Sequence, residues 1–353
     1  MITSGRWIAG IMVAAHAMLA SAGTAAAEAA PPRITSLYDA FGATSAMQKD
    51  WGYSAFIEYR GKRILFDTGN NAEIFAHNVK AKNIDLTKLD FVVISHRHGD
   101  HTSGLNYLTT VNHDVTIFAP QENWGVFGGS VPGAFYRRNE SLPAQMRYFG
   151  GNAPDTLRQG TPWPSAHFTW VAKHMEAAPG FHLIVLKGNW GVDLELMEVS
   201  LAIDTPEGIV LIVGCSHPTI EKVVAATFEA IPNKPIHLII GGTHLLPASD
   251  EEITQIAASL HDTSKVEWIA PVHCTGEPAF VILQKFFGDH YLYAGLGSTV
   301  VAGQKVVAYE DSGAPAVARA MSHEERQRYQ QLARAELAEE QPLLAAADPR
   351  TGY

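Results

Sequence analysis

Short apolar runs, rich in β-branched residues and bounded by turn residues, recur along most of the chain. Runs of this length and composition predict buried strands, because amphipathic helices need longer periodic patterns. In the first half they cover residues 34–38, 53–59, 63–67, 91–94 and 115–119. In the second half they cover residues 181–186, 195–203, 208–213, 237–240, 268–271, 291–293 and 305–308.

Helix-forming segments alternate with these strands. They cover residues 71–80, 103–108, 218–231, 250–260 and 276–287. Pro218 falls in the first turn of one of them, where its missing N–H costs nothing. Two strand-rich halves with helices on the outside predict an α/β fold in which two sheets pack face to face, an αββα sandwich.

Residues from about 121 to 180 break this pattern and form a predicted insertion. Periodicity is weak there, and aromatic residues are frequent: Trp124, Phe127, Phe135, Tyr136, Tyr148, Phe149, Trp163, Phe168 and Trp170. A loop of this length in a compact domain is usually functional or disordered, and the aromatic content argues against disorder. Two interpretations stay open: an apolar wall over a substrate site, or a structural excursion packed on the sheet.

The first 27 residues have the features of a secretory signal peptide. Arg6 supplies a positive charge, residues 7–19 are mostly apolar, and Ala25-Ala26-Ala27 offers a small-residue cleavage site. The mature chain is therefore expected in a bacterial periplasm or outside the cell, with no stable membrane anchoring after cleavage. An uncleaved anchor is the alternative.

Residues 28–310 are predicted to form the main domain, and residues 311–353 a helical tail. Ser322 and Glu325 make a capping box that precedes strong helix formers. Most faces of this helix are charged, so we expect it to pack loosely or to contact a partner chain in an oligomer. The net charge of −10 and the scattered lysines and arginines argue against a nucleic-acid partner. A small-molecule substrate is expected instead.

The densest group of metal-ligand residue types directly follows the apolar run at 91–94. His96, His98, Asp100 and His101 fall within six residues. In an extended segment, residues two apart project to the same side, so His96 and His98 are predicted to share one ion. Asp100 and His101 are then predicted to bind a second ion. Imidazole and carboxylate ligands together suit Zn²⁺, Mn²⁺ or Fe.

Three later histidines also stand where a predicted strand ends. A centre with two metal ions needs further ligands, and His217 and His273 are the candidates for them. His244 follows a third strand and two glycines. It is predicted either to contact a substrate oxyanion or to act as a seventh ligand.

The chain has two cysteines, Cys215 and Cys274. In an exported protein two cysteines can form a disulfide. Each of them, however, lies beside one of the candidate histidines, which favours a position near the metal or simple packing of buried thiols.

These motifs resemble those of a known superfamily. His96-x-His98-x-Asp100-His101, with Asp67-Thr68-Gly69 before it, resembles the signature of metallo-β-lactamase-fold metal-dependent hydrolases. Three further segments resemble a narrower branch of that superfamily: Gly214 to His217, Gly241 to Leu245 and His273 to Gly276. This branch is labelled after 7,8-dihydropterin-6-methyl-4-(β-D-ribofuranosyl)aminobenzene-5′-phosphate synthase. The resemblance covers about residues 35–310 and implies the αββα metallo-β-lactamase fold.

The resemblance also implies roles for two more residues. Asp67 is expected to orient a ligand histidine through its second ring nitrogen. Many relatives carry a metal-bridging aspartate where this chain has Cys215, so Cys215 is expected either to bind metal as a thiolate or to be an inert buried thiol.

Together, the motifs predict an exported hydrolase with two divalent ions, zinc first and manganese or iron as alternatives. A hydroxide bridging the ions would attack a small ester, lactone, lactam or phosphodiester, and Asp100 would hold or transfer the proton. The alternatives are a non-catalytic metal-binding module and a diiron redox protein, although no flavin or nucleotide fingerprint is present.

Overall fold

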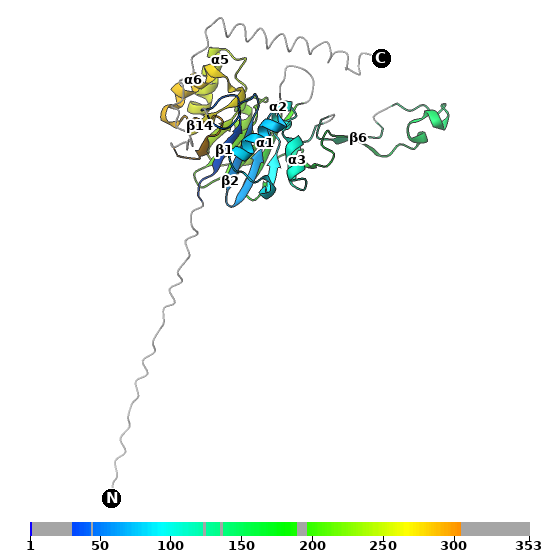
Figure 1. Ribbon diagram of the computed structural model, residues 1–353, viewed down its shortest axis with the longest axis horizontal. Coiled ribbons are helices and arrows are strands. Elements are labelled where there is room, and N and C mark those ends of the chain that lie inside the picture. Colours follow the sequence, from blue (N-terminus) through cyan, green and yellow to red (C-terminus); the bar gives the residue numbers. More distant parts are fainter. Residues whose placement is uncertain (2–29, 44, 123–124, 135–136, 189–195, 305–353) are drawn as a thin grey trace.

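Two sheets packed face to face form the body of the protein (Figure 1). The computed structural model describes residues 1, 30–43, 45–122, 125–134, 137–188 and 196–304. Residues 2–27 of the expected signal peptide, the expected strand at 305–308 and the expected tail at 311–353 lie outside these described residues. The predicted αββα architecture is confirmed.

Seven strands of the described chain form the first sheet, in the order β15-β1-β2-β3-β4-β5-β8. Their bounds are β1 (Arg33–Tyr38), β2 (Ser54–Tyr59), β3 (Lys62–Phe66), β4 (Phe91–Val93), β5 (Thr116–Pro120), β8 (His167–Val171) and β15 (Thr299–Val301). The helices on this side are α1 (Ala72–Ala81), α2 (Gly99–Thr102) and α3 (Leu105–Val111).

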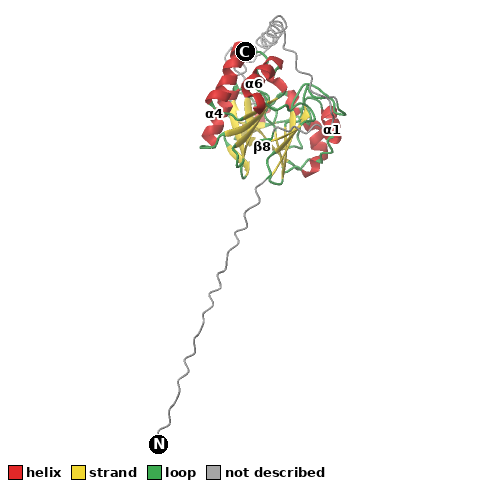
Figure 2. Ribbon diagram, turned by 90° about the vertical axis from the view of Figure 1, so that its left-hand side faces the viewer, coloured by secondary structure: helices red, strands yellow, loops and turns green. Residues whose placement is uncertain are grey.

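Six described strands form the second sheet, in the order β14-β13-β12-β11-β10-β9. Their bounds are β9 (Met175–Ala178), β10 (Phe181–Lys187), β11 (Met197–Asp204), β12 (Ile209–Val213), β13 (Ile236–Gly241) and β14 (Trp268–Pro271). The helices on this side are α4 (Ile220–Ala230), α5 (Asp250–Ala258) and α6 (Glu277–Phe287). Figure 2 shows the strands between α4 and α6 on one side and α1 on the other.

Strand β12 shows how the sequence pattern produces this layering. All five of its residues are buried. Val210 and Ile212 join the core between the two sheets. Ile209, Leu211 and Val213 face the opposite way, into the core under the helices. Because neighbouring side chains of a strand point to opposite faces, an uninterrupted apolar run is required wherever both faces are covered.

The strand directions bring several chain turns to one edge of the sandwich. In the first sheet β3, β4 and β5 run parallel, and in the second sheet β12, β13 and β14 run parallel. The carboxyl ends of parallel strands lie at the same edge of their sheet, where loops gather and sites are commonly built. The two edges meet, because the backbone N–H of Val199 donates to the Ser95 carbonyl oxygen at 2.7 Å.

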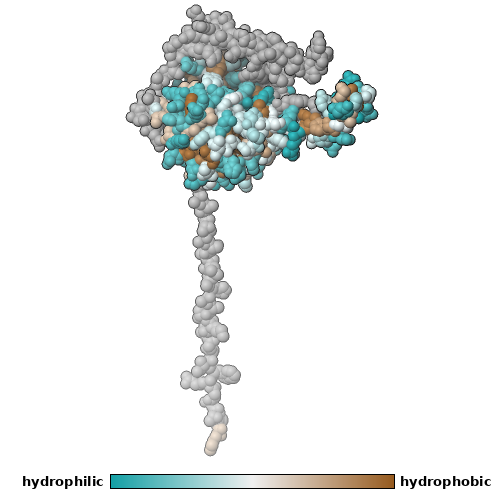
Figure 3. Space-filling model, turned by 45° about the vertical axis from the view of Figure 1, so that its right-hand side comes forward, coloured by the Kyte–Doolittle hydropathy of each residue, from teal (hydrophilic) through white to brown (hydrophobic). Residues whose placement is uncertain are grey.

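The segment from 121 to 180 contains both sheet strands and a projecting arm. Strand β8 extends the first sheet beside β5, and β9 pairs with β10 in the second. The hairpin of β6 (Gly129–Pro132) and β7 (Thr156–Gln159) leads to the short 3-10 turns η2 (Ala144–Met146) and η3 (Tyr148–Gly151). Figure 1 shows this arm extending away from the sandwich, and Figure 3 shows hydrophobic surface on it.

Trp124, Phe135 and Tyr136 lie outside the described residues, and the described aromatic residues of that segment are divided between the first sheet and the arm. Phe127 and Trp163 are buried in the core on the outer face of the first sheet. Tyr148 and Phe149 are exposed on the arm, at 70% and 58% of their surface. The buried group therefore packs on the sheet, as the structural interpretation of the segment predicted.

A few elements differ from the predicted pattern. The strand expected at 291–293 is reduced to a single bridge between Tyr291 and Ile269, and β15 forms a few residues later without having been predicted. The helix expected at 103–108 begins two residues later, as α3, and the short helix α2 before it was not predicted. No helix among the described residues combines the length and apolarity needed to cross a bilayer.

Candidate metal centre

The loop after β4 places its ligand-type side chains at the edge where the sheets meet. His96 and His98 lie on the same side of an extended stretch, with His96 Nε2 3.0 Å from His98 Nδ1. His98 then serves as the N-cap residue of α2, and this short helix turns His101 back toward the site. The imidazole rings of His96 and His101 are 4.2 Å apart between centroids.

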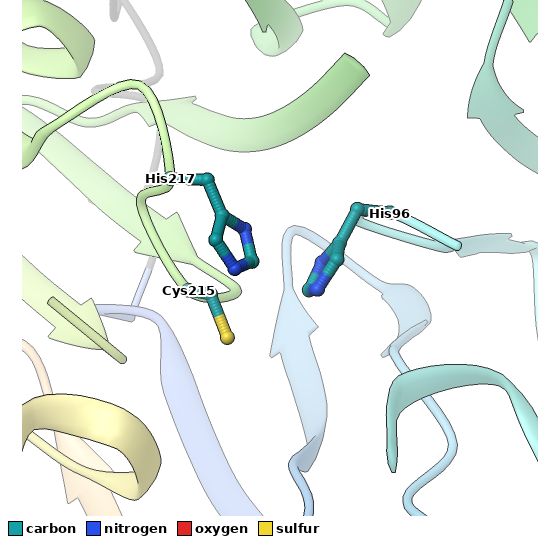
Figure 4. A group of neighbouring side chains, drawn as sticks. All are labelled: His96, Cys215 and His217. Atoms are coloured by element: carbon teal, nitrogen blue, oxygen red, sulfur yellow. The ribbon is translucent and has the colours of Figure 1, made fainter. Parts of the chain in front are cut away.

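The structure brings His217 and Cys215 from the turn after β12 against this loop. The ligand atoms of His96, Cys215 and His217 all lie within 4.8 Å of one another. In Figure 4 the three side chains point toward a common centre. The ring of His98 packs beside them, 4.9 Å from the ring of His217.

A second group lies next to the first and contains the same cysteine. The ligand atoms of His101, Cys215 and His273 lie within 4.8 Å of one another. Asp100 joins this group, because its Oδ2 atom is 3.7 Å from His101 Nε2 and 3.4 Å from His273 Nε2. All six residues predicted as ligands are thus gathered at one edge, in two neighbouring groups.

His244 and Cys274 lie on the flank of the centre. The ligand atoms of Cys215, His244 and Cys274 form a third group within 4.8 Å, and the ring of His244 lies 4.6 Å from that of His217. Both cysteines are free thiols, so the alternative of a disulfide is not realised.

Buried carboxylates behind the histidines fix which ring nitrogen faces the centre. Asp67 Oδ2 accepts from His101 Nδ1 at 2.7 Å and from the Ser95 hydroxyl at 2.7 Å. Ser95 Oγ in turn accepts from His96 Nδ1 at 2.8 Å. Since the Nδ1 atoms of both rings are used as donors, the Nε2 atoms are left as metal-ligand atoms. Asp67 thus takes the orienting position that the resemblance implied.

Glu198 gives the same support on the other sheet. Its Oε2 accepts from His217 Nδ1 at 2.9 Å and from the His217 backbone N–H at 2.8 Å. Its Oε1 accepts from the backbone N–H groups of Cys215 and Ser216 at 2.8 and 2.7 Å. Sequence reasoning missed Glu198. The available signal was a glutamate within a buried strand that is mostly apolar.

Two more site residues were missed because they lie far away in the sequence. Asp39 directly follows β1, is fully buried, and accepts from the backbone N–H of His273 at 3.1 Å. Trp51 packs on the His273 ring with 4.9 Å between centroids and stays 40% exposed. Asp39 could have been predicted as a site residue because it is an acidic residue directly after a strand. No feature of the sequence marks Trp51 as a site residue.

Burial and neighbouring charges set different protonation states for the histidines. Burial, together with His217 and His101, lowers the pKa of His98 to about 3, and burial lowers the pKa of His96 well below its usual range. Burial acts the same way on His101, but the carboxylates of Asp100 and Asp67 outweigh it and raise its pKa to about 9. Burial raises the pKa of the Cys215 thiol.

The donor set fits a centre for divalent transition metals. Uncharged imidazoles are already available at His96 and His98. A bound cation would take the place of the proton on His101 and on Cys215, because metal binding displaces protons from its ligands. Imidazole, carboxylate and thiolate donors together suit transition-metal ions, while sites for calcium and magnesium are built from oxygen ligands.

Comparison with known proteins agrees with this geometry. Residues 62–181 match the family described as "Beta-lactamase superfamily domain". The chain is 30% identical over 272 residues to 7,8-dihydropterin-6-methyl-4-(beta-D-ribofuranosyl)-aminobenzene-5'-phosphate synthase of Methanocaldococcus jannaschii, covering 73% of this chain and 92% of that protein.

Two further matches bear on the fold and on one part of the chain. The crystal structure of Tm1679, a metal-dependent hydrolase of the beta-lactamase superfamily, aligns with a TM-score of 0.57 and 26% identity, over 77% of this chain and 99% of that one. Ribonuclease Z of Nanoarchaeum equitans is 35% identical over 74 residues, which is 19% of this chain and 22% of that enzyme. The chain belongs to the metallo-β-lactamase-fold superfamily, in the branch that contains the M. jannaschii synthase.

Proposed function

We propose that the protein is an exported hydrolase that uses two divalent metal ions on a small ester, lactone, lactam or phosphodiester. The observation that carries the proposal is the pair of adjoining ligand groups, one with His96 and His217 and the other with His101 and His273, joined at Cys215. Zinc is the expected metal, with manganese or iron as alternatives. Membership of a superfamily that contains metal-dependent hydrolases supports the hydrolytic reaction.

The residues around the centre have separable tasks in this proposal. When bound, the ions supply Lewis acidity and lower the pKa of water. Burial alone would raise the pKa of Asp100, but His101 and His273 hold it well below its usual range, so its Oδ2 atom is ionised and able to accept a proton. His244 lies on the flank of the centre, beside the ring of His217, and its proposed task is to contact a substrate oxygen. The exposed face of Trp51 supplies an apolar wall beside His273.

The first test is the metal content of the purified protein, combined with a substrate panel. We expect two equivalents of zinc, manganese or iron, and hydrolysis of at least one lactone, lactam, ester or phosphodiester that is lost on chelation. His98→Ala should lower the metal content, whereas the matched variant His113→Ala, at an exposed histidine outside the candidate ligand groups, should not. One equivalent or none contradicts the dinuclear centre. Two equivalents without turnover of any substrate would leave a metal-binding module.

A second candidate reaction follows from the 30% identity to the M. jannaschii synthase. It is formation of 7,8-dihydropterin-6-methyl-4-(β-D-ribofuranosyl)-aminobenzene-5′-phosphate, the product for which that relative is named. A 7,8-dihydropterin with a leaving group on its 6-methyl carbon is added to the same panel together with 4-(β-D-ribofuranosyl)aminobenzene 5′-phosphate. The synthase reaction joins the two molecules and expels the leaving group, whereas hydrolysis does not join them.

Export is proposed from residues 1–27 of the sequence. Fractionation of bacteria producing the whole chain, compared with a chain lacking residues 2–27, tests it. We expect a shortened mature protein in the periplasm or medium only for the whole chain. Equal amounts of both proteins in the cytoplasm contradict export.

A further inference from the structure

One sulfur atom belongs to every candidate ligand group in the described part of the chain. Cys215 lies with His96 and His217 in one group, and with His101 and His273 in another. Its Sγ atom is 3.2 Å from His101 Nε2. Each of these two groups combines one imidazole that follows a strand of the first sheet, His96 or His101, with one that follows a strand of the second, His217 or His273.

The position of this sulfur is fixed by the backbone around it. Glu198 Oε1 holds the N–H groups of Cys215 and Ser216, at 2.8 and 2.7 Å. Ser216 adopts a left-handed conformation with φ of 64°, and its hydroxyl donates to the Gly242 carbonyl oxygen at 2.9 Å. Cys215 is 3% exposed. A ligand held this firmly by outer contacts is preorganised for metal binding.

The second cysteine offers a built-in contrast. Cys274 belongs to one of the three groups, the one on the flank with His244. Its thiol donates to the Cys215 carbonyl oxygen at 3.7 Å, which uses its proton within the protein. It is as deeply buried as Cys215, at 2% exposure. The two cysteines therefore differ in the number of ligand groups that they join rather than in burial.

We propose that Cys215 is a ligand common to both metal positions, a bridging thiolate. We further propose that this sulfur selects zinc, iron or cobalt over magnesium and manganese. Thiolate ligands favour the softer ions, while manganese and magnesium prefer oxygen. On metal binding the thiol proton leaves to solvent, and sulfur donates electron pairs to both ions. This inference rests on the dinuclear centre of the proposed function, but it does not depend on which substrate is hydrolysed.

Cobalt substitution tests the sulfur ligand directly. The metal-free full-length protein is titrated with Co²⁺ under reducing conditions, and bound cobalt is measured together with the near-ultraviolet thiolate-to-cobalt charge-transfer absorption. The variants are Cys215→Ser and Cys215→Asp, with Cys274→Ser as the matched control. We expect the wild type and Cys274→Ser to show the band while two equivalents bind, and both Cys215 variants to lack it.

Metal preference is the second readout. Cys215→Asp keeps a single negative charge and offers oxygen in place of sulfur. We expect it still to bind two ions, and its preference for zinc over manganese, measured in direct competition, to fall by about tenfold or more. Circular dichroism of the metal-free variants checks that each one folds. If one Cys215 variant does not fold, the other is compared with Cys274→Ser, so the test still gives an answer.

The outcomes separate this inference from the proposed function. A charge-transfer band that persists in Cys215→Ser, or that disappears in Cys274→Ser alone, overturns the inference. The absence of the charge-transfer band from wild-type protein that holds two cobalt ions also overturns the inference. A band that depends on Cys215 in a protein that hydrolyses nothing in the substrate panel would support the sulfur ligand and refute the hydrolase.

Discussion

Replacement of Glu198 by glutamine is expected to lower the stability of the metal-free protein substantially. The glutamate is buried in β11 and accepts four hydrogen bonds, two on each oxygen. A glutamine side chain has the same shape, but its amide nitrogen cannot accept. Whichever way the amide is turned, two buried donors lose their acceptor, either those of His217 or the backbone N–H groups of Cys215 and Ser216.

The size of the effect follows from two independent arguments. A buried donor left without an acceptor costs about 1–3 kcal/mol, so two of them cost about 4 kcal/mol. Burial alone would raise the pKa of Glu198, but His217 and the N–H groups of Cys215 and Ser216 lower it from 4.5 to about 2. That difference corresponds to about 3 kcal/mol of stability. Both arguments place the loss near 3–4 kcal/mol.

The same reasoning fixes the pH dependence. The pKa of Glu198 is lower in the folded than in the unfolded chain, so its contribution is complete above pH 4.5 and is lost as the pH falls toward 2. The assay is urea denaturation of chelator-treated protein at neutral pH and at several acidic values. Glu229→Gln, at an exposed position of α4, is the matched control. A loss below about 1 kcal/mol at neutral pH, or an equal loss at every pH, would refute the assigned role of Glu198.

Three further predictions concern the supports of the centre and the metal itself. Asp67→Asn removes the acceptor that orients His101 and should weaken zinc binding about 10–100-fold in competition with a chelator; unchanged affinity contradicts this role. Arg97→Met leaves the buried carboxylate of Glu122 without its cation at 2.6 Å and should lower the free energy of unfolding by about 3 kcal/mol. A loss within about 0.5 kcal/mol would mean that this ion pair contributes little. Chelation should lower the melting temperature of zinc-loaded protein, and added zinc should restore it, since free zinc at 100 times its Kd stabilises by about 2.7 kcal/mol. An unchanged melting temperature contradicts a centre coupled to folding.

Local sequence patterns predicted most of the fold and the positions of the candidate ligands. The uninterrupted apolar run of β12 could only be a strand covered on both faces, and the structure buries all five of its residues. His217 and His273 could be selected because each directly follows such a run. Their relation to His96 and His101 depends on the packing of two sheets, which no local pattern contains. It entered the prediction through the resemblance to a superfamily.

The carboxylates that support the centre were harder to predict, for a physical reason. Glu198 acts on residues 17 to 19 positions further along, and Asp39 acts on a residue 234 positions away. A buried carboxylate is tolerated only where donors converge on it, and most of the donors here are backbone N–H groups, which every residue except proline carries. The sequence therefore shows an unusual acidic residue within a strand or at its end, but it does not show which residues donate hydrogen bonds to that carboxylate.

The backbone conformations at the strand ends explain why this edge holds the chemistry. Asp67, Ser216, His244 and His273 follow four different strands, and each has a φ between 49° and 64°. A left-handed conformation costs a non-glycine residue about 1–2 kcal/mol, and four such positions close together need compensation. Buried hydrogen bonds supply it, since Asp67 accepts from both Ser95 and His101 while Glu198 holds the turn at Ser216. The sharp turns direct side chains from both sheets toward one centre. The strained backbone and the buried carboxylates that offset its cost therefore act together to position the candidate ligands.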